Sequence, residues 1–321
     1  MTSPALGARV SLAATPTPLE RADRLAELLG LRPGRLWIKR DDLTGLAGGG
    51  QKARMLEYLC ADAVAAGADT LVTGAGPASN HVRLSAAAAR RLGMRCEAVI
   101  GGDRPAEPAG NILLAHLLGA RFTWIGPATL AQAAQRVRAL AAELAQAGAR
   151  PYALPVGSAS KTGSLGYVRL AAELDEQLPG ADLVVAGNAT GMTFCGLAAG
   201  LGSFRRLLGV DVGAMPFPAG KLLADTAEVA ALAGLGPPAG QPVMDWGQVG
   251  AGYQHETPAA RDARRLAAAA EGILLDPIYG ARALAGLRDA VRSGRVPATA
   301  RVIFIHTGGL PAVFTGSRPD W

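Results

Sequence analysis

Strand-like and helix-like segments alternate along most of this 321-residue chain, and this alternation constrains its fold most strongly. Short β-branched runs such as Leu71-Val72-Thr73 are followed by longer alanine- and leucine-rich stretches such as 130–147. Parallel strands need a crossover connection, usually a helix, so this order predicts βαβ units and parallel sheets. The predicted strands are 70–73, 98–100, 122–125, 152–154, 183–186, 208–212 and 301–305, and the predicted helices include 84–92, 112–118, 130–147 and 165–178.

Length and composition agree with an α/β protein. A chain of 321 residues exceeds the size at which a single hydrophobic core stops growing, so two lobes are expected. Half of the residues are hydrophobic, only 5% are aromatic and 42 are glycine, which favours layers built from alanine, leucine and valine over a β-sandwich. The segment 234–258 is rich in glycine, proline and glutamine, and we expect it to be a long loop at a functional site.

Lys52 stands out because only four of the 32 basic residues are lysines, and this one lies in the glycine-rich run 48–54. Arginine stays protonated, whereas a lysine amine in a dry site can lose its proton and act as a nucleophile or a base. Met55, Leu56 and Leu59 follow at helical spacing and place Lys52 in the first turn of a helix. From this residue alone, a solvated lysine at a helix start remains the alternative.

Three further turns join a strand to small polar residues. The segment 74–83 and the segment 184–193 each read as strand, turn and helix start, and the strand 301–305 ends in His306-Thr307-Gly308-Gly309. A helix start offers free backbone N–H groups to an anion. Ligands of open α/β sheets bind at the carboxyl ends of the strands, so these turns are candidate binding segments.

The ordered combination of these motifs resembles the D-cysteine desulfhydrase and 1-aminocyclopropane-1-carboxylate deaminase family of pyridoxal-phosphate enzymes. Hallmarks of that family are a Gly-Gly-Asn-Lys turn, a Ser-Asn-(His or Gln) turn and a His-Thr-Gly-Gly end. The resemblance covers nearly the whole chain, and the segments that carry it are 16–20, 48–54, 74–83, 184–193, 274–279 and 306–309. It implies a two-lobed α/β protein with open parallel sheets, the tryptophan-synthase-β-like fold. Residues 50–160 would form a smaller inserted lobe, and residues 1–49 with 161–321 would form the larger cofactor-binding lobe.

The resemblance also implies how pyridoxal 5'-phosphate is held. Lys52 would bind the cofactor through its amine and then act as a base near the substrate Cα. The phosphate would lie on backbone N–H groups and hydroxyls of one turn, without a basic side chain. That turn is Ala189, Thr190, Gly191, Met192 and Thr193.

The remaining roles follow the family motifs. Asn80 would bind the ring hydroxyl of the cofactor, and Thr307 would face the pyridine nitrogen. Ser79, with the backbone near His81, would take the substrate carboxylate, so Ser79, Asn80 and His81 are expected in the substrate site. Tyr279 would lie over the substrate and Tyr253 would close from the long loop. Lys52, Ser79, Tyr253 and Tyr279 are therefore the expected catalytic residues, although each tyrosine alone could be a packing residue.

Several positions depart from the family pattern, namely Gln51, Ala78, Ala189, Met192 and Gly280. His81 is similar to the desulfhydrase motif, since the deaminases have glutamine there. Gly280 replaces the glutamate of the deaminases and is expected to leave space in the pocket. These features favour β-elimination from D-cysteine or a relative such as cysteate, giving pyruvate, ammonia and the leaving group. Ring-opening deamination, β-replacement and a non-catalytic binding homologue are the alternatives.

The other sequence features do not require further partners. The net charge of +6 comes from arginines scattered along helical segments, with no nucleic-acid-binding motif. Cys60, Cys96 and Cys195 are widely spaced, which indicates a reducing compartment. No apolar stretch reaches membrane-spanning length, and no histidine, cysteine and carboxylate set suggests a metal. We expect a cytoplasmic enzyme of amino acid metabolism without metal, nucleic-acid or membrane partners, and the resemblance implies a homodimer.

Overall fold

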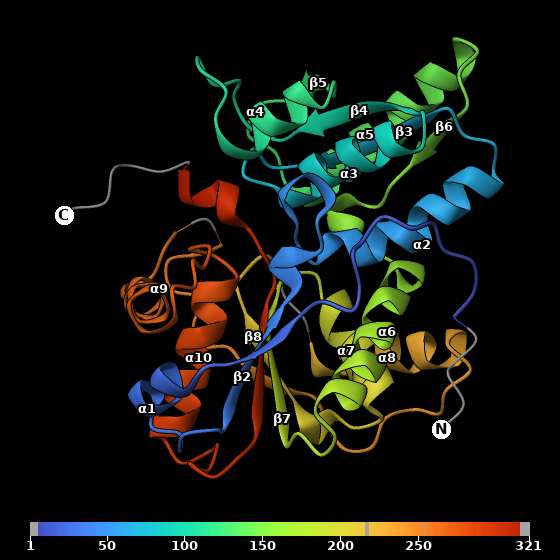
Figure 1. Ribbon diagram of the computed structural model, residues 1–321. Helices are drawn as coiled ribbons and strands as arrows, with labels where there is room; N and C mark the ends of the chain where they lie inside the picture. The colour runs from blue at the N-terminus through green and yellow to red at the C-terminus, as the bar shows by residue number, and fades with distance from the viewer. Residues whose placement is uncertain (1–5, 216–217, 254, 315–321) are drawn as a thin grey trace. The chain divides into compact units, whose positions relative to one another are not determined.

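The computed structural model describes residues 6–215, 218–253 and 255–314 and divides them into two compact α/β units (Figure 1). The larger unit contains residues 6, 15–44 and 164–310, and the smaller contains 7–14, 45–163 and 311–314. These boundaries lie at 44/45 and 163/164, whereas the sequence placed them at 49/50 and 160/161. The segment 7–14 also packs with the smaller unit, where Arg9 forms an ion pair with Glu57 at 2.7 Å.

A six-stranded sheet in the order β1-β2-β10-β7-β8-β9 forms the centre of the larger unit. All of its neighbouring strands are parallel except β1, which pairs antiparallel with β2 at the edge. Its strands are β1 (Leu19–Arg21), β2 (Leu36–Arg40), β7 (Leu183–Asn188), β8 (Leu207–Asp211), β9 (Val243–Asp245) and β10 (Val302–His306).

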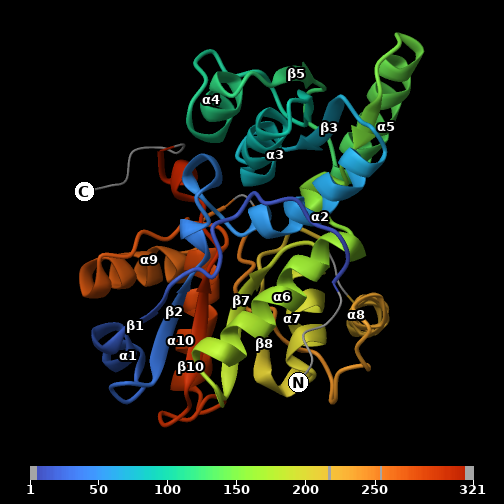
Figure 2. The ribbon, with the colours of Figure 1, turned by 45° about the vertical axis from the view of Figure 1, so that its right-hand side comes forward.

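Helices cover both faces of this sheet, so its central strands are mostly apolar and turn polar only at their carboxyl ends. One face packs against α1 (Asp23–Leu29), α9 (Pro258–Glu271) and α10 (Gly280–Arg292) around a core that includes Val185 and Phe304. Figure 2 shows α6 (Lys161–Gln177), α7 (Met192–Leu201) and α8 (Ala219–Leu232) on the other side of the sheet. Short 3₁₀ turns lie at Asp41–Leu43, Phe204–Arg206 and Leu310–Phe314.

A four-stranded parallel sheet in the order β5-β4-β3-β6 forms the smaller unit. Alternation along β3 sends Leu71 into the core beneath α2, α3 and α4, and Val72 towards α5, where it meets Val137. The strands are β3 (Thr70–Ala75), β4 (Arg95–Ile100), β5 (Arg121–Trp124) and β6 (Pro151–Ala153). The helices are α2 (Lys52–Ala65), α3 (Asn80–Arg91), α4 (Gly110–Leu117) and α5 (Leu130–Gln146), with 3₁₀ turns at Leu46–Gly48 and Val156–Ser158.

The structure confirms the predicted fold class and the seven predicted strands. Three strands were not predicted: β1 at the sheet edge, its neighbour β2, and β9. Because β9 pairs with β8 through Val243 and Leu208, the segment 234–258 is not a continuous loop, and that prediction was wrong in its middle. No helix among the described residues is long and apolar enough to cross a membrane.

Candidate active site

Lys52 is the first residue of α2, as the sequence predicted, and a glycine turn delivers the chain to it. Gly48, Gly49 and Gly50 have φ values of 84°, 76° and 125°, a region that residues with a Cβ rarely adopt. The Lys52 amine donates a hydrogen bond to the carbonyl oxygen of Gly157 at 2.8 Å and lies 3.6 Å from the sulfur of Met55. Burial lowers the pKa of Lys52 to about 8 from its usual 10.5.

A buried arginine, which the sequence reasoning did not identify, supports this glycine turn. Arg83 on α3 is fully buried and donates to the carbonyl of Gly49 at 3.0 Å and to that of Ala47. Its Nε donates to Asn111 Oδ1 at 2.9 Å. These bonds satisfy carbonyls that a turn of this shape leaves unpaired, so Arg83 fixes the turn that precedes Lys52.

Ser79 and Asn80 form the start of α3. The Ser79 hydroxyl accepts a hydrogen bond from the His81 N–H at 3.2 Å and so caps the helix. Asn80 Oδ1 accepts from Asn111 Nδ2 at 3.2 Å, and Asn111 also donates to the carbonyl of Ala78 at 2.8 Å. Because the Asn80 oxygen is held within the protein, its NH₂ group is the end that is oriented to donate to a ligand.

The His81 side chain lies inside the smaller unit, with only 2% of the residue exposed. Its Nε2 is 2.8 Å from the hydroxyl of Thr73 on β3, and its Nδ1 is 3.4 Å from that of Ser85. Burial, together with the charge of Lys52, lowers the pKa of His81 to about 3. His81 is therefore a neutral imidazole at physiological pH.

In the larger unit, β7 ends in the turn Ala189–Thr193, which leads directly into α7. Gly191 is the N-cap of this ten-residue helix with a φ of 82°, and no side chain caps the first turn. The first N–H groups of α7 are thus oriented towards the turn, at the positive end of the helix dipole. Thr193 is 6% exposed in the first turn. This geometry suits a phosphate group.

Asn188, directly before this turn, was not among the predicted site residues. It is 1% exposed, and neither its Oδ1 nor its Nδ2 has a hydrogen-bond partner within the described part of the chain. A buried amide without partners costs free energy, so its presence at the end of β7 indicates a ligand or solvent partner. The Val184-to-Thr193 motif contained the signal, since an asparagine interrupts an apolar strand there.

Tyr253 and Tyr279, both predicted as catalytic residues, contact each other in the larger unit. Their hydroxyl oxygens are in hydrogen-bond contact, and their rings lie 6.0 Å apart at an angle of 77°. Burial raises the pKa of Tyr279 well above its usual value. A Cβ on Gly187 would lie 3.0 Å from the Tyr279 carbonyl oxygen, so this glycine lets β7 approach the tyrosine.

Asp276 organises the turn that carries Tyr279. Its carboxylate accepts hydrogen bonds from the N–H groups of Ile278 at 3.0 Å, Tyr279 at 2.8 Å and Gly280 at 2.8 Å. A Cβ on Gly280 would lie 3.2 Å from both Asp276 Oδ1 and Leu275 Cδ2. The expectation that Gly280 leaves space is therefore wrong, because Asp276 and Leu275 fill the direction in which its side chain would begin.

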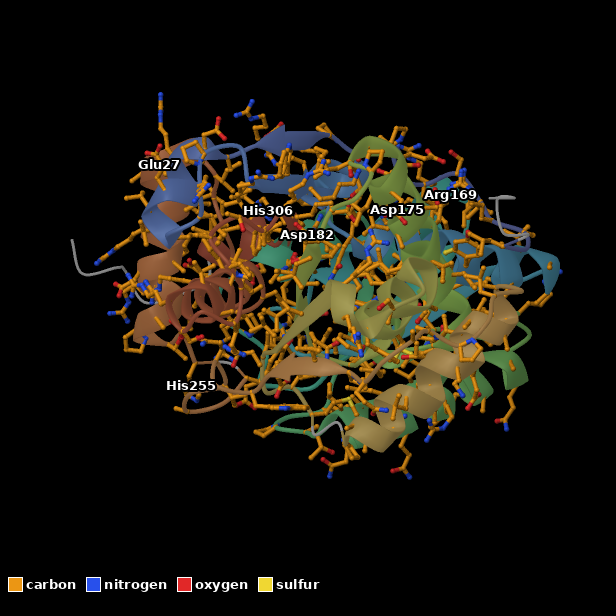
Figure 3. All side chains as sticks on the ribbon, turned by 90° about the horizontal axis from the view of Figure 1, so that it is seen from below. Glu27, Arg169, Asp175, Asp182, His255 and His306 are labelled. Atoms are coloured by element: carbon orange, nitrogen blue, oxygen red, sulfur yellow. The ribbon has the colours of Figure 1, made fainter. Side chains whose placement is uncertain are left out.

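Thr307 follows β10 and is 8% exposed. Beside it, His306 Nδ1 accepts from the Gly308 N–H at 3.3 Å, and His306 Nε2 lies 3.6 Å from Asp42. Burial lowers the pKa of His306. In Figure 3, His306 is labelled near the middle of the view and His255 at its margin. The His306 side chain is only 3% exposed, whereas His255 is exposed. The buried imidazole thus holds the turn of Thr307 and Gly308.

The predicted site residues fall into two groups, one in each unit. Lys52, Ser79, Asn80 and His81 belong to the smaller unit, and the turn 189–193 with Tyr253, Tyr279 and Thr307 belongs to the larger. The smaller unit offers an amine with a lowered pKa and the larger unit offers a helix start suited to phosphate, which is the chemistry of an α/β protein that binds a phosphorylated ligand.

Comparison with known proteins identifies that class. Residues 10–308 match the family described as pyridoxal-phosphate dependent enzyme, and the chain belongs to this family. It is 37% identical to a D-cysteine desulfhydrase of Salmonella schwarzengrund and 37% identical to a 1-aminocyclopropane-1-carboxylate deaminase of Methylobacterium nodulans. Each of these matches covers 95% of both chains.

Solved structures agree. A crystal structure of an ACC deaminase homologue superposes with a TM-score of 0.87 at 33% identity, covering 96% of this chain and 93% of the other. Threonine deaminase isoform 2 from Solanum lycopersicum, with a TM-score of 0.65 at 18% identity over 92% and 80% of the two chains, shares the fold. The predicted resemblance, fold and cofactor are confirmed. In the larger unit, the free α7 N-terminus and the unpartnered Asn188 amide fit the phosphate of pyridoxal phosphate, and in the smaller unit the Lys52 amine fits its aldehyde.

Proposed function

We propose that this chain is a lyase that removes the Cβ substituent from a small amino acid such as D-cysteine, releasing pyruvate, ammonia and sulfide. The 37% identity to D-cysteine desulfhydrase over 95% of both chains carries the proposal. His81 supports it, because it was the residue of the motif that distinguished the desulfhydrase pattern from the deaminase pattern.

Lys52 is the proposed cofactor lysine and Cα base. When bound, pyridoxal phosphate withdraws electrons from the Cα of an amine substrate and makes its proton easier to remove. With a pKa of about 8, roughly 300-fold more of the Lys52 amine is neutral at pH 7 than at its usual pKa. A neutral amine can accept the Cα proton, and the Gly157 carbonyl holds the nitrogen in place.

Phosphate binding is proposed for the turn Ala189–Thr193. The uncapped N–H groups at the start of α7 would donate to the phosphate oxygens, and the hydroxyls of Thr190 and Thr193 would add to them. This arrangement stabilises the anion without a basic side chain. Met192 and Ala189, where the family has glycines, would contribute through their backbones.

Substrate binding and ring contacts are proposed for the α3 start and the β10 end. Because Ser79 Oγ already accepts from the His81 N–H, its own hydrogen can be donated to the substrate carboxylate. The Asn80 NH₂ group would donate to the ring hydroxyl of the cofactor. Thr307 would place a neutral hydroxyl at the pyridine nitrogen. In this proposal the neutral His81 ring adds no positive charge next to the Lys52 amine.

Tyr279 and Tyr253 are the proposed acids for the leaving group. Burial keeps both phenols protonated at neutral pH, since it raises both of their pKa values. When the Cβ–S bond breaks with its electron pair, a phenol can donate its proton to the departing sulfur. The hydroxyl contact between the two tyrosines lets one replace the proton lost by the other.

Ring-opening deamination is the second candidate. It is favoured by the 37% identity to a 1-aminocyclopropane-1-carboxylate deaminase and by the structural match with an ACC deaminase homologue. β-Replacement would use the same Cα proton removal. A non-catalytic homologue would keep the binding turns without needing a base as reactive as Lys52.

We also propose that the enzyme is a cytoplasmic homodimer without nucleic-acid or membrane partners. Cys60, Cys96 and Cys195 are buried free thiols, which supports a reducing compartment. The homodimer rests on the family resemblance, and light scattering after size-exclusion chromatography measures it directly.

The activity test is a screen of small amino acids of both hands for release of 2-oxo acid and of sulfide. D-cysteine is expected to give both products, and Lys52→Ala to give neither. A faster reaction with 1-aminocyclopropane-1-carboxylate would establish the second candidate instead. Equal turnover by the wild type and Lys52→Ala would refute the role of Lys52.

A further inference from the structure

Arg282 is a fully buried arginine on α10, in the same helix start that carries Tyr279. Its guanidinium donates to three backbone carbonyl oxygens. One Nη binds the carbonyl of Val212, which follows β8, and the other binds those of Gly252, at 2.8 Å, and His255. Arg282 therefore connects the end of β8 and the segment between β9 and α9 to the start of α10.

The two carbonyls that share one Nη flank Tyr253 in the sequence. Tyr253 lies between Gly252 and His255, and its hydroxyl meets that of Tyr279. The described residues 246–253 and 255–257 have only short turns of their own, and the backbone bonds among them are those of Gly252 to Val249 and of His255 to Gly252. Side chains also hold Gln248 to Asp289 and Glu256 to Arg264, at 2.9 Å each. The bonds from Arg282 to Gly252 and His255 are those next to Tyr253, so they fix the backbone that carries its ring.

An arginine is suited to this task for geometric reasons. Its planar guanidinium donates hydrogen bonds in several fixed directions, whereas a lysine ammonium is a compact charge on a flexible side chain. The charge also matters, because the guanidinium interacts electrostatically with Asp211, Asp276 and the two tyrosines. Burial lowers the pKa of Arg282, and these acidic groups oppose that effect. The guanidinium in turn lowers the pKa of both phenols against the larger effect of burial.

We propose that Arg282 is a positioning residue that holds the Tyr253 segment against α10 and keeps the two tyrosine hydroxyls in contact. Tyr253 and Tyr279 then form one acid pair whose geometry and charge depend on a side chain that does not touch the substrate. The catalytic consequence rests on the proposed lyase function, but the structural consequence does not.

Two variants test this proposal, with a control from the same helix. Arg282→Met removes the donors and the charge, and Arg282→Lys keeps the charge while losing the planar guanidinium. Arg288→Met is the control, because Arg288 is also buried on α10, at 8% exposure, and donates to no backbone carbonyl of the described chain.

The first readout is limited proteolysis of the cofactor-free protein within 246–257. Losing charge-assisted hydrogen bonds to this segment should speed its cleavage at least about tenfold in Arg282→Met, less in Arg282→Lys and not in Arg288→Met. The second readout is the ultraviolet titration of tyrosine. The transition assigned to the pair by Tyr253→Phe and Tyr279→Phe should move to higher pH in Arg282→Met and stay near the wild-type position in Arg282→Lys.

Kinetics provide the third readout. If the pair acts in the chemical step, Arg282→Met should lower kcat about tenfold or more with little change in KM, and Arg282→Lys should recover part of it. Wild-type protection and wild-type tyrosine titration in Arg282→Met would overturn the proposal. If that variant does not fold, wild-type protection of residues 246–257 from proteolysis in Arg282→Lys would overturn it, because the planar guanidinium is then dispensable. If the wild type has no lyase activity but Arg282→Met is cleaved faster than the wild type, the proposed function is refuted and the positioning role of Arg282 stands.

Discussion

Replacing Lys52 by methionine should stabilise the cofactor-free protein near neutral pH, although it removes a hydrogen bond. Holding the ammonium in its site lowers the pKa of Lys52 from 10.5 to about 8, which corresponds to about 3 kcal/mol of destabilisation. Removing the hydrogen bond to the Gly157 carbonyl destabilises the variant by about 1 kcal/mol. Solvent screening of the partly exposed Lys52 side chain makes the stabilisation from removing its charge smaller still. We expect a net stabilisation of about 1–2 kcal/mol at pH 7.

The pH dependence of this gain identifies its cause. Between about pH 8 and 10.5 the unfolded chain binds more protons at Lys52 than the folded protein does, so wild-type stability rises with pH through this window. The penalty is complete below about pH 8 and absent above 10.5. The difference between Lys52→Met and the wild type should therefore be largest at pH 7 and shrink as the pH approaches 10.5.

Urea unfolding of both cofactor-free proteins at a series of pH values measures this difference. Lys221→Met is the control, because the Lys221 side chain is 52% exposed and pairs with Asp225 on the surface of α8. It should show no stabilisation at pH 7. A Lys52→Met variant that is less stable than the wild type at pH 7, or whose difference does not depend on pH, would refute the argument that the amine is desolvated.

Three further substitutions give distinct outcomes. Asn188→Leu removes a buried amide without partners in the described chain. It should stabilise the cofactor-free protein by roughly 1–3 kcal/mol in urea unfolding and weaken cofactor binding in a fluorescence titration. No change in either measurement would contradict the inference that Asn188 binds a ligand. Gly280→Thr should lower the free energy of unfolding by about 1–3 kcal/mol, because its Cβ meets Asp276 and Leu275, and an unchanged thermal midpoint would show that the site is open. Ser79→Ala should lower the free energy of unfolding by about 1 kcal/mol, because a helix cap is lost, and should also raise KM. Ser79→Thr should keep the wild-type stability and the wild-type KM. An unchanged KM in Ser79→Ala would exclude Ser79 from carboxylate binding.

The elements that the sequence predicted well are those with a strong local pattern. The strands β3 and β10 are rich in β-branched residues and buried at every position, so they are recognisable without any knowledge of their neighbours. Lys52 could be placed at the start of α2 because glycines precede it and apolar residues follow at helical spacing. By contrast, β1 and β9 have three residues each, and pairing with a neighbouring strand determines them more than their own composition does.

What the sequence could not give are the contacts between distant residues. Arg83 and Arg282 read as two more members of an arginine-rich surface, because nothing local shows that their guanidinium groups bind backbone carbonyls far away in the chain. Gly280 was expected to open the pocket, yet the turn stabilised by Asp276 folds Leu275 back against it. Such features depend on tertiary packing, which a residue's own motif does not encode.

The central claim is that Lys52 binds the cofactor, and borohydride reduction followed by peptide mapping tests it most directly. The chain has four lysines, so each possible outcome can be identified. The Lys39 amine is buried in hydrogen bonds to Glu173 and Gln177, whereas the Lys52 amine has a lowered pKa and donates to the Gly157 carbonyl at 2.8 Å. The purified protein should be yellow and carry the reduced pyridoxyl group on Lys52. A label on Lys39, Lys161 or Lys221, or a protein that takes up no added cofactor, would contradict the account.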